Sequence, residues 1–294
     1  MKPAAFDYYT PHTLDEALEL IEKYGYDAKI LAGGQSLIPT MNMRLARPQV
    51  LVDIGRLHDL TYIRAADTDV QVGATTPHYQ IEQSAEIARV CPMLSEGIRL
   101  VGHSQIRSRG TVGGSLVHAD PTAELPVILR TLGGAVTLAS LAGERTVAAE
   151  EFFFTYMTTT IEPNEMLVAT SFPKITPRTG HAIEEFALRK GDFAIVLAAA
   201  SVTLDEAGKM KSVSIGLGGV DGAPIRLEDI EDELEDTEPD SDWIAECCES
   251  IRDEIDPEPD IHASVEYRKD LSVTLSRRVI EKAVARAKEQ YSYA

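Results

Sequence analysis

Two glycine pairs, each with a serine close behind, are the residues of this chain best suited to bind a ligand. They stand in Ala32-Gly33-Gly34-Gln35-Ser36 and in Thr111-Val112-Gly113-Gly114-Ser115. Glycine permits positive φ and lets a ligand approach the main chain where a Cβ would obstruct it. Successive backbone N–H groups in such turns form anion-binding nests, to which hydroxyl groups can add donors. The two turns could therefore grip a diphosphate from two sides, although a lone Gly-Gly is more often only a tight turn.

A compact βαβ unit is expected to position the first pair. The pattern predicts a strand over residues 29–32, a helix over 36–45 that Pro48 ends, and a second strand over 50–54. Thr13 and Glu16 form a capping box for a preceding helix, which Gly25 terminates. Because a helix follows Ser36, its N-terminal partial positive charge adds attraction for a phosphate.

The sequence pattern after residue 57 predicts a middle part of mixed strands and helices, followed by an antiparallel sheet with helices. This order indicates the α+β class. Asp120 is expected to cap a helix whose first position is Pro121. The expected elements are a strand and turn over 69–77, helices over 76–102 broken near Pro92, an irregular glycine-rich segment over 107–121, a helix over 122–132, strands over 135–140, 165–172, 183–190, 193–204 and 211–220, and helices around 243–254 and 264–290.

The net charge of −19 is concentrated in one segment. Residues 228–260 hold 17 Asp and Glu and one Arg, whereas the remainder has 27 basic and 30 acidic side chains. No basic stripe balances this acidity, which argues against a nucleic-acid-binding protein. We interpret the segment as a solvated acidic helix with flanking loops; adaptation to high salt and a docking surface for a basic partner are the alternatives.

The three cysteines argue against a metal site made by this chain alone. Cys91, Cys247 and Cys248 include no CxxC spacing, so a zinc site or an iron–sulfur cluster is not expected. If the protein does redox chemistry, its redox centre is then an organic cofactor. The N-terminus has no apolar signal region, and the longest apolar run, 193–204, is too short to span a bilayer. We therefore expect a cytoplasmic protein with no transmembrane segment.

Longer strings around the glycine pairs resemble a known family. "KILAGGQSLIP…LVDI" and "QIRSRGTVGGSLVHADPTAELP" resemble the FAD-binding medium subunit of molybdenum hydroxylases, the carbon monoxide dehydrogenase and xanthine dehydrogenase group. "LRKGDFAIV", "GLGGVDGAPIR" and "EIDPEPDIHASVEYRKDL" resemble the C-terminal domain of that subunit. The resemblance implies a two-lobed, PCMH-type FAD-binding domain over 1–175, with lobes of about 1–57 and 58–175. A small α+β C-terminal domain with an antiparallel sheet and helices then covers 176–294.

The same resemblance implies FAD as cofactor, with its diphosphate and ribityl chain between the two glycine turns. Glu124 matches an acidic position on the flavin side, and Phe193 matches an aromatic position near the isoalloxazine. No catalytic and no metal-ligating residue is expected. The residues implied to bind the cofactor are Ile30, Leu31, Ala32, Gly33, Gly34, Gln35, Ser36, Leu37, Val101, Thr111, Val112, Gly113, Gly114, Ser115, Glu124, Leu167, Lys190 and Phe193.

Other polar and aromatic residues are better explained by structure than by chemistry. Asp53 suits an end-of-strand turn. The residues weighed and left without a catalytic role are His103 and His118; Lys29, Arg107 and Arg109, which suit either diphosphate neutralisation or surface salt bridges; and Tyr8, Tyr9 and residues 152–157, which suit core or interface packing.

By this resemblance the chain does not oxidise the substrate itself. A large molybdopterin-binding subunit would do so, and a small subunit with two [2Fe–2S] clusters would pass electrons to FAD here, then to a quinone, NAD or oxygen. The implied assembly is a dimer of heterotrimers, which could lie at the inner face of the membrane. The substrate, whether carbon monoxide, a purine, an aldehyde or another heterocycle, is chosen in another subunit. The alternatives are a stand-alone FAD-dependent oxidase or reductase and a non-catalytic assembly protein.

Overall fold

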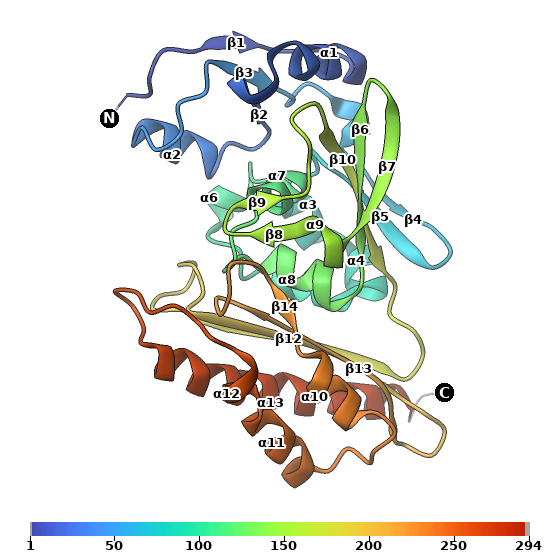
Figure 1. Cartoon of the computed structure of the whole chain (residues 1–294). Helices are drawn as coiled ribbons and strands as arrows, with labels where there is room; N and C mark the ends of the chain where they lie inside the picture. The colour runs from blue at the N-terminus through green and yellow to red at the C-terminus, as the bar shows by residue number, and fades with distance from the viewer. Residues whose placement is uncertain (1, 292–294) are drawn as a thin grey trace.

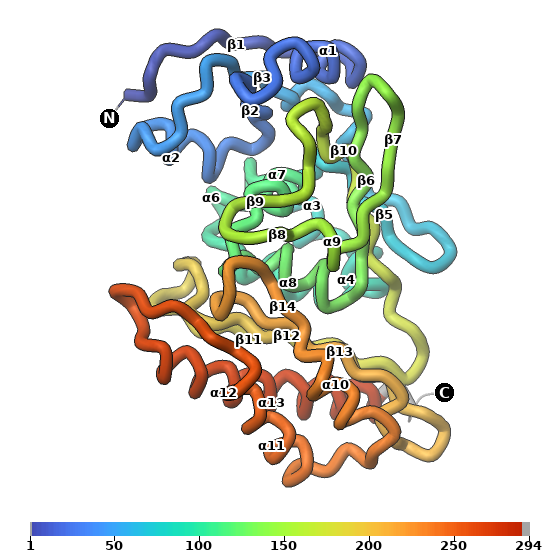
Figure 2. The backbone as a smooth tube through the Cα atoms, in the orientation of Figure 1, coloured from blue at the N-terminus to red at the C-terminus, as the bar shows by residue number. Residues whose placement is uncertain are grey.

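The computed structural model describes residues 2–291, and the chain runs from a small parallel sheet at one end to a helix-covered antiparallel sheet at the other (Figures 1 and 2). The first sheet has the order β1-β3-β2 and is parallel throughout. Its strands and helices are β1 (Asp7–Tyr9), α1 (Leu14–Tyr24), the 3-10 turn η1 (Gly25–Asp27), β2 (Ala28–Leu31), α2 (Leu37–Asn42) and β3 (Val50–Asp53). The predicted βαβ unit is confirmed. Helix α2 is shorter than predicted, because the chain leaves it through Arg44 in the left-handed region (φ +62°).

The caps of α1 follow the sequence prediction. The Thr13 hydroxyl accepts a hydrogen bond from the Glu16 N–H (3.2 Å), and the Glu16 carboxylate accepts one from the His12 N–H (2.7 Å), one residue before the cap. Gly25 ends the helix at φ +49°. Asp53 serves as the expected end-of-strand residue, because its side chain accepts from the Gly55 N–H (2.8 Å). These bonds fix both ends of the unit that carries the first glycine turn.

A five-stranded antiparallel sheet forms the middle of the molecule, in the order β4-β5-β10-β6-β7. Helices lie beside this sheet and share a buried core with it, including Leu94, Leu116, Ile128 and Phe172. The elements are η2 (His58–Leu60), β4 (Ile63–Ala65), β5 (Asp69–Gly73), α3 (His78–Gln83), α4 (Ala85–Val90), α5 (Pro92–Gly97), α6 (Ser104–Arg107), α7 (Val112–His118), α8 (Glu124–Thr131), β6 (Ala135–Ser140), β7 (Gly143–Ala148), α9 (Ala149–Phe152), β8 (Phe153–Thr155), β9 (Thr158–Thr159) and β10 (Met166–Pro173).

Two predictions for this part are wrong. The segment predicted to be irregular contains α7, so the second glycine pair lies in the first turn of a helix. Helix α8 begins at Glu124, and Asp120 does not cap it. The Asp120 carboxylate instead accepts from the N–H (2.9 Å) and the hydroxyl (2.6 Å) of Thr122. This local turn holds Pro121 outside the helix.

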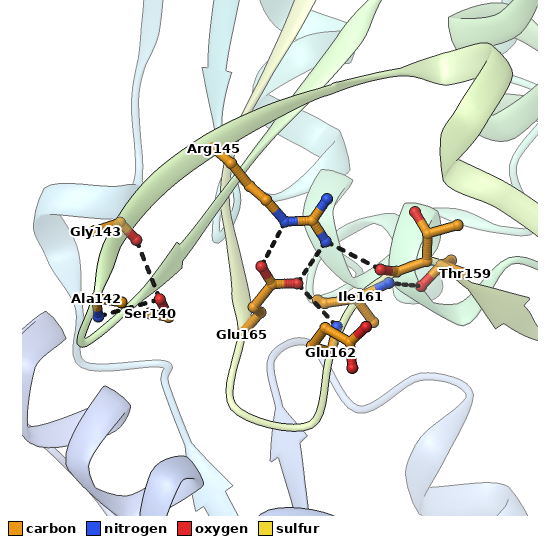
Figure 3. A network of polar contacts seen from close by, with 9 residues as sticks. Ser140, Ala142, Gly143, Arg145, Thr159, Ile161, Glu162 and Glu165 are labelled. Atoms are coloured by element: carbon orange, nitrogen blue, oxygen red, sulfur yellow. Dashed lines mark hydrogen bonds and ion pairs between the residues drawn. The ribbon is translucent and has the colours of Figure 1, made fainter.

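Arg145 of β7 ties down the loop that leads into β10 (Figure 3). Its Nε and Nη2 donate to the two Glu165 oxygens (2.6 and 2.7 Å), and Nη2 also donates to the Thr160 carbonyl (3.1 Å). Glu165 in turn accepts from the Glu162 N–H (2.8 Å). The guanidinium holds the pKa of Glu165 below its usual range. These bonds fix residues 160–165, the loop that leads into β10.

The C-terminal sheet is antiparallel, in the order β11-β12-β13-β14, and the long helix α13 covers one face of it (Figure 1). Ile183 and Leu197 on its other face join the core of the middle part. Its elements are β11 (Thr179–Phe186), β12 (Val196–Leu204), β13 (Met210–Gly218), β14 (Ile225–Arg226), α10 (Glu228–Leu234), α11 (Ser241–Glu249), α12 (Ile251–Glu254) and α13 (Val265–Tyr291). The three predicted strands and the long helix are confirmed as elements, while α10 and β14 had no prediction. The first strand was placed too late: β11 ends at Phe186, and residues 187–190 belong to the loop before β12. The predicted domain boundary at 175/176, between β10 and β11, stays a prediction.

Helices of the acidic segment are amphipathic. Ile230, Leu234, Ile244 and Ile251 are buried in the C-terminal core, and most of the carboxylates face outward. Glu231 is the buried exception, and it pairs with Arg226. Among residues 2–291, no helix combines the length and the apolarity needed to cross a membrane.

Candidate functional site

A cavity of about 700 Å³ lies where the parallel sheet, the middle helices and the C-terminal loop 187–195 approach one another. This volume is within the range of small-molecule and cofactor sites. Fifteen of the eighteen predicted cofactor residues line it: Ile30, Ala32, Gly33, Gly34, Gln35, Ser36, Leu37, Val101, Thr111, Gly113, Gly114, Ser115, Glu124, Leu167 and Phe193.

The other three predicted residues do not line the cavity. Leu31 packs its side chain beside Gly34. Val112 is fully buried in the core, and its N–H donates to the Thr76 carbonyl (3.0 Å). Lys190 is exposed on the loop between β11 and β12. A cofactor contact by any of these three stays a prediction.

The first glycine turn presents unused backbone donors to the cavity. Gly34 has φ +71°, a region where glycine is favoured. The carbonyls of Gly33 and Gly34 accept from the Gln35 side chain and the Ile38 N–H (both 3.1 Å). Within residues 2–291, the N–H groups of Gly34, Gln35 and Ser36 have no acceptor. Free N–H groups on consecutive residues are what an anion-binding nest requires, and binding of a diphosphate at this turn stays a prediction.

The second glycine turn has no such free donors, so its predicted role as a matching nest is wrong. The Gly113 N–H donates to the Ala74 carbonyl (2.9 Å) and the Gly114 N–H to the Thr111 hydroxyl (3.1 Å). The Ser115 N–H donates to the Thr111 carbonyl (3.0 Å). A Cβ on Gly113 would stand 2.8 Å from the Ala74 carbonyl oxygen. These glycines therefore serve close packing, and the turn offers hydroxyls and bare main chain to a ligand.

Direct contact joins the two turns. A Cβ on Gly33 would stand 2.8 Å from the Gly110 Cα and closer still to the Arg109 carbonyl oxygen. A Cβ on Gly114 would lie 3.6 Å from the Ala32 Cβ. The absence of side chains thus brings two segments, far apart in the sequence, to opposite sides of one narrow cavity.

Carboxyl groups lie beyond the second turn. Burial raises the pKa of Glu124 to about 8. A hydrogen bond from its own backbone N–H opposes this rise in part, and the nearby Glu185 and Asp120 carboxylates add smaller increases. Burial also raises the pKa of Glu185 to about 7. Glu124 is therefore largely protonated near neutral pH. A neutral carboxyl can donate a hydrogen bond and does not repel a phosphate.

The three basic residues that could neutralise a diphosphate differ in their positions. Lys29 lines the cavity. Arg107 is committed elsewhere: it pairs with Glu82 (2.9 Å) and donates to the carbonyls of Val101 and Gly102 (3.1 and 3.2 Å). The salt-bridge alternative is therefore the correct one for Arg107. Arg109 contributes its carbonyl to the contact with Gly33.

The cavity has further lining residues that the sequence did not predict. Asp120 and His118 are among them, although the sequence suggested other roles for both. No local motif marks Met157 and Ile161, because residues distant in the sequence hold their loop. The Met157 N–H donates to the Ala119 carbonyl (3.2 Å), and Arg145 donates to the Thr160 carbonyl (3.1 Å). His78 lies directly after Thr75-Thr76-Pro77, at a strand-to-helix corner, whereas His118, Asp120 and Asp192 lie within the strings that resemble the family. The principal additions are Thr40, Leu45, Ala46, Ile54, Ala74, His78, Gly102, Ile106, Gly110, Val117, His118, Asp120, Ala123, Met157, Ile161, Met166, Gly191 and Asp192.

This donor set fits FAD. The free amides suit a diphosphate, the bare glycines leave room for close approach, and apolar Val101 and Leu167 line the walls. Phe193, 66% exposed, offers an aromatic ring at the edge of the cavity. Among the described residues there is no cluster of three or more His, Cys, Asp or Glu placed to hold a metal ion.

Comparison with known proteins agrees with this geometry. Residues 4–175 match the family model "FAD binding domain in molybdopterin dehydrogenase", and residues 181–283 match "CO dehydrogenase flavoprotein C-terminal domain". The 6-hydroxypseudooxynicotine dehydrogenase complex subunit alpha of Paenarthrobacter nicotinovorans is 41% identical, over 98% of this chain and 97% of that protein. The carbon monoxide dehydrogenase medium chain of Afipia carboxidovorans is 37% identical, over 98% and 100%.

Solved structures give the same result. A chain of the reconstituted CO dehydrogenase from Oligotropha carboxidovorans matches with a TM-score of 0.94 and 36% identity, over 97% of this chain and 100% of that one. The predicted α+β class and FAD-binding character are confirmed. Family models, relatives and fold agree over nearly the whole length, and the chain therefore belongs to the family of FAD-binding medium subunits of molybdenum hydroxylases.

Proposed function

We propose that this chain holds FAD and carries electrons through it as the medium subunit of a molybdenum hydroxylase. The observation that supports this most is the nest of free amides at Gly34, Gln35 and Ser36, which opens into a cavity of cofactor size. Bound FAD supplies the redox chemistry, since it accepts electrons from one centre and passes them to another. The protein has to bind it, orient it and exclude water.

Each side of the cavity contributes a different contact. The amides of the first turn bind the diphosphate, with the dipole of α2 adding attraction. The hydroxyl of Ser115 and the protonated carboxyl of Glu124 donate from the opposite side. Phe193 packs at the flavin end. Met157, Ile161 and residues 191–193 line the cavity beside these contacts and would limit the access of solvent to the bound cofactor.

The partners follow from the relatives, which are named as subunits or chains of dehydrogenase complexes. A large molybdopterin-binding subunit would oxidise the substrate, and a small subunit with two [2Fe–2S] clusters would deliver the electrons. We propose a dimer of such heterotrimers in the cytoplasm, with a quinone, NAD or oxygen as acceptor. Relatives of this chain are named for two different substrates, 6-hydroxypseudooxynicotine and carbon monoxide. We therefore propose that the large subunit, and not this chain, selects the substrate.

The absorption spectrum of the purified chain tests the proposal. We expect a yellow protein with about one FAD per chain, recovered after removal and re-addition of FAD. A colourless chain that cannot be reconstituted overturns the proposal and supports the assembly-protein alternative. Bleaching of the flavin by a substrate without any partner subunit supports the stand-alone oxidase or reductase instead.

A further inference from the structure

Arg268 of α13 is buried between the ends of two strands of the C-terminal sheet. It is 6% exposed. Its Nη1 donates to the carbonyls of Ile195 (2.5 Å) and Gly219 (2.8 Å), and its Nη2 pairs with the Asp260 carboxylate (2.7 Å). The ladder between β12 and β13 ends before it reaches either carbonyl. The guanidinium therefore satisfies two backbone groups at the point where the sheet supplies no partner.

Adjacent residues of α13 hold both legs of the loop 187–195. Arg268 binds the Ile195 carbonyl, and the Ile195 N–H donates to the Phe186 carbonyl (2.7 Å) across the base of the loop. The Tyr267 ring packs edge-on against the Phe186 ring, with the two centroids 6.1 Å apart. The helix thus fixes the place where this loop leaves the sheet.

The tip of the same loop lines the cavity. Residues 191–193 are among the lining residues, and Phe193 is accessible there. Gly191 has φ +86° and packs against His103, so that a Cβ on it would collide with the imidazole ring. The middle part of the molecule therefore holds the loop at its tip, and α13 holds it at its base, at Ile195.

Through Gly219 the guanidinium reaches a second segment of the cavity wall. The Gly219 N–H donates to the Pro121 carbonyl (2.9 Å), and the neighbouring Asp120 lines the cavity. Gly219 has φ +80°, and a Cβ on it would collide with the Ile195 carbonyl. One buried side chain thus joins the base of the loop to the segment that follows α7.

Burial of a guanidinium is costly, and an apolar side chain of similar volume often serves packing equally well. The cost is visible at Arg268, because its Nε has no partner within residues 2–291. An arginine adds what an apolar residue lacks: a planar fork whose donors point in fixed directions. Here that fork sets the position of two carbonyls, those of Ile195 and Gly219.

We propose that Arg268 is a positioning residue for bound FAD, which holds Phe193 at the flavin end of the cavity through the Ile195 carbonyl. Arg268 is not among the described residues that line the cavity, so it acts through the loop. Its loss would leave two buried carbonyls without a donor and loosen the loop at its base. The inference rests on the proposed FAD-binding function.

The test is a double-mutant cycle in the full chain, with Arg268→Lys and Phe193→Ala made singly and together. Titration of flavin-depleted protein gives the Kd for FAD, and visible circular dichroism reports how firmly the isoalloxazine is held. We expect each single substitution to raise Kd about fivefold, or about 1 kcal/mol, and to weaken the dichroism of bound flavin. Adding Arg268→Lys to Phe193→Ala should change Kd by less than about twofold, because the ring that the arginine positions is gone.

Arg226→Lys is the matched control. Arg226 also pairs with a carboxylate of the C-terminal part, the buried Glu231, and it is not among the described residues that line the cavity. Like Arg268→Lys, the substitution should lower the melting temperature of the FAD-free chain. It should leave the Kd for FAD and the dichroism of the bound flavin unchanged.

A milder variant covers the case in which Arg268→Lys does not fold. Asp260→Asn removes only the counter-charge of the guanidinium, from a side chain that is 44% exposed. It should raise the Kd for FAD about twofold when Phe193 is present and leave it unchanged in the Phe193→Ala background.

Four results overturn the inference. Arg268→Lys binds FAD within about twofold of wild type, or its effect adds fully to that of Phe193→Ala, as expected of a residue that acts on stability alone. Phe193→Ala leaves both the Kd and the dichroism unchanged. Where Arg268→Lys does not fold, Asp260→Asn leaves the Kd unchanged. A wild-type chain that binds no FAD refutes the proposed function instead, before any variant is compared.

Discussion

The two glycine turns look alike in sequence and differ in what they give to a ligand. At Gly33-Gly34 the amides of three consecutive residues, 34–36, have no acceptor within the described residues. At Gly113-Gly114 the corresponding amides are bound by the Ala74 carbonyl and by Thr111. The first turn offers main-chain donors, whereas the second offers side chains.

The cause of this difference is the neighbouring chain. Residues 74–76, which follow β5, run beside the second turn and take up the N–H groups of Val112 and Gly113. The first turn meets only the Arg109–Gly110 backbone, which packs on Gly33 without accepting its N–H. A Gly-Gly pair therefore marks close approach, and whether its amides are free is decided by a segment far away in the sequence.

Gly33→Ala should have the largest effect on the first glycine turn. The new Cβ would collide with the Arg109 carbonyl, a backbone group that cannot move aside. We expect a loss of unfolding free energy of about 3 kcal/mol or more, together with loss of bound FAD. The measurements are urea denaturation and the FAD content of the purified chain.

Gly34→Ala is the matched variant. Its Cβ would meet only the flexible side chains of Leu31 and Ile38, at 3.1 Å. The left-handed backbone should cost about 1 kcal/mol. Equal losses in the two variants would contradict the packing role assigned to Gly33.

Glu124→Gln tests the acidic side of the second turn. The pKa of Glu124 is raised from 4.5 to about 8 in the folded chain, so the folded state binds more protons than the unfolded state between these pH values. Stability from this group is then lost as pH rises toward 8. Between pH 6 and pH 8 the ionisation of Glu124 should lower the free energy of unfolding by about 2–3 kcal/mol, and this decrease should be absent in Glu124→Gln.

Denaturation of the FAD-free chain at several pH values measures this effect. Glu185→Gln is the control, and its smaller effect is expected because Glu185 is less buried and its pKa is raised less, to about 7. An unchanged pH profile for Glu124→Gln would mean that Glu124 is already ionised, and that carboxylates face the bound phosphates.

Local sequence patterns predicted the elements that depend on near neighbours. The Thr13 cap, the βαβ unit and the three long C-terminal strands follow from capping and periodicity within about ten residues. The predictions failed where a long-range or competing contact decides. The Asp120 carboxylate could accept a hydrogen bond either from the N–H of Thr122 or from an N–H at the start of α8. It accepts from Thr122, which is nearer in the sequence. The short helix α7 was not predicted, because two glycines in its first turn lower the helix propensity of the segment.

The candidate site shows the same division. Its lining from the glycine strings was predicted through the family resemblance, because those strings are contiguous. The contributions of Met157 and Ile161 were not, since contacts with Ala119 and Arg145, both distant in the sequence, hold their loop. The burial of His78 could not be predicted either, because it depends on every group that surrounds the ring.

Thr111→Ala should have a moderate effect. The Thr111 hydroxyl caps α7 through the Gly114 N–H, so the substitution should lower stability by about 1 kcal/mol. It also frees one amide of the second turn and makes it more like the first. Thr111→Ser should retain the cap and the stability, as measured by thermal melting. A Thr111→Ala chain as stable as wild type would show that this cap contributes nothing.

The smallest expected effect separates the two serines. Ser115→Ala should raise the Kd for FAD about threefold, or about 0.7 kcal/mol, because the second turn has no free amide to take over from the hydroxyl. Ser36→Ala should change Kd by less than twofold, since the free amides at residues 34–36 remain. Folding should not obscure the result: alanine favours a helix at position 115, and the Ser36 side chain makes no cap bond to α2. If Ser36→Ala weakens FAD binding more than Ser115→Ala, then the first turn holds the cofactor through its side chain, and the contrast between amide and side-chain donors is wrong.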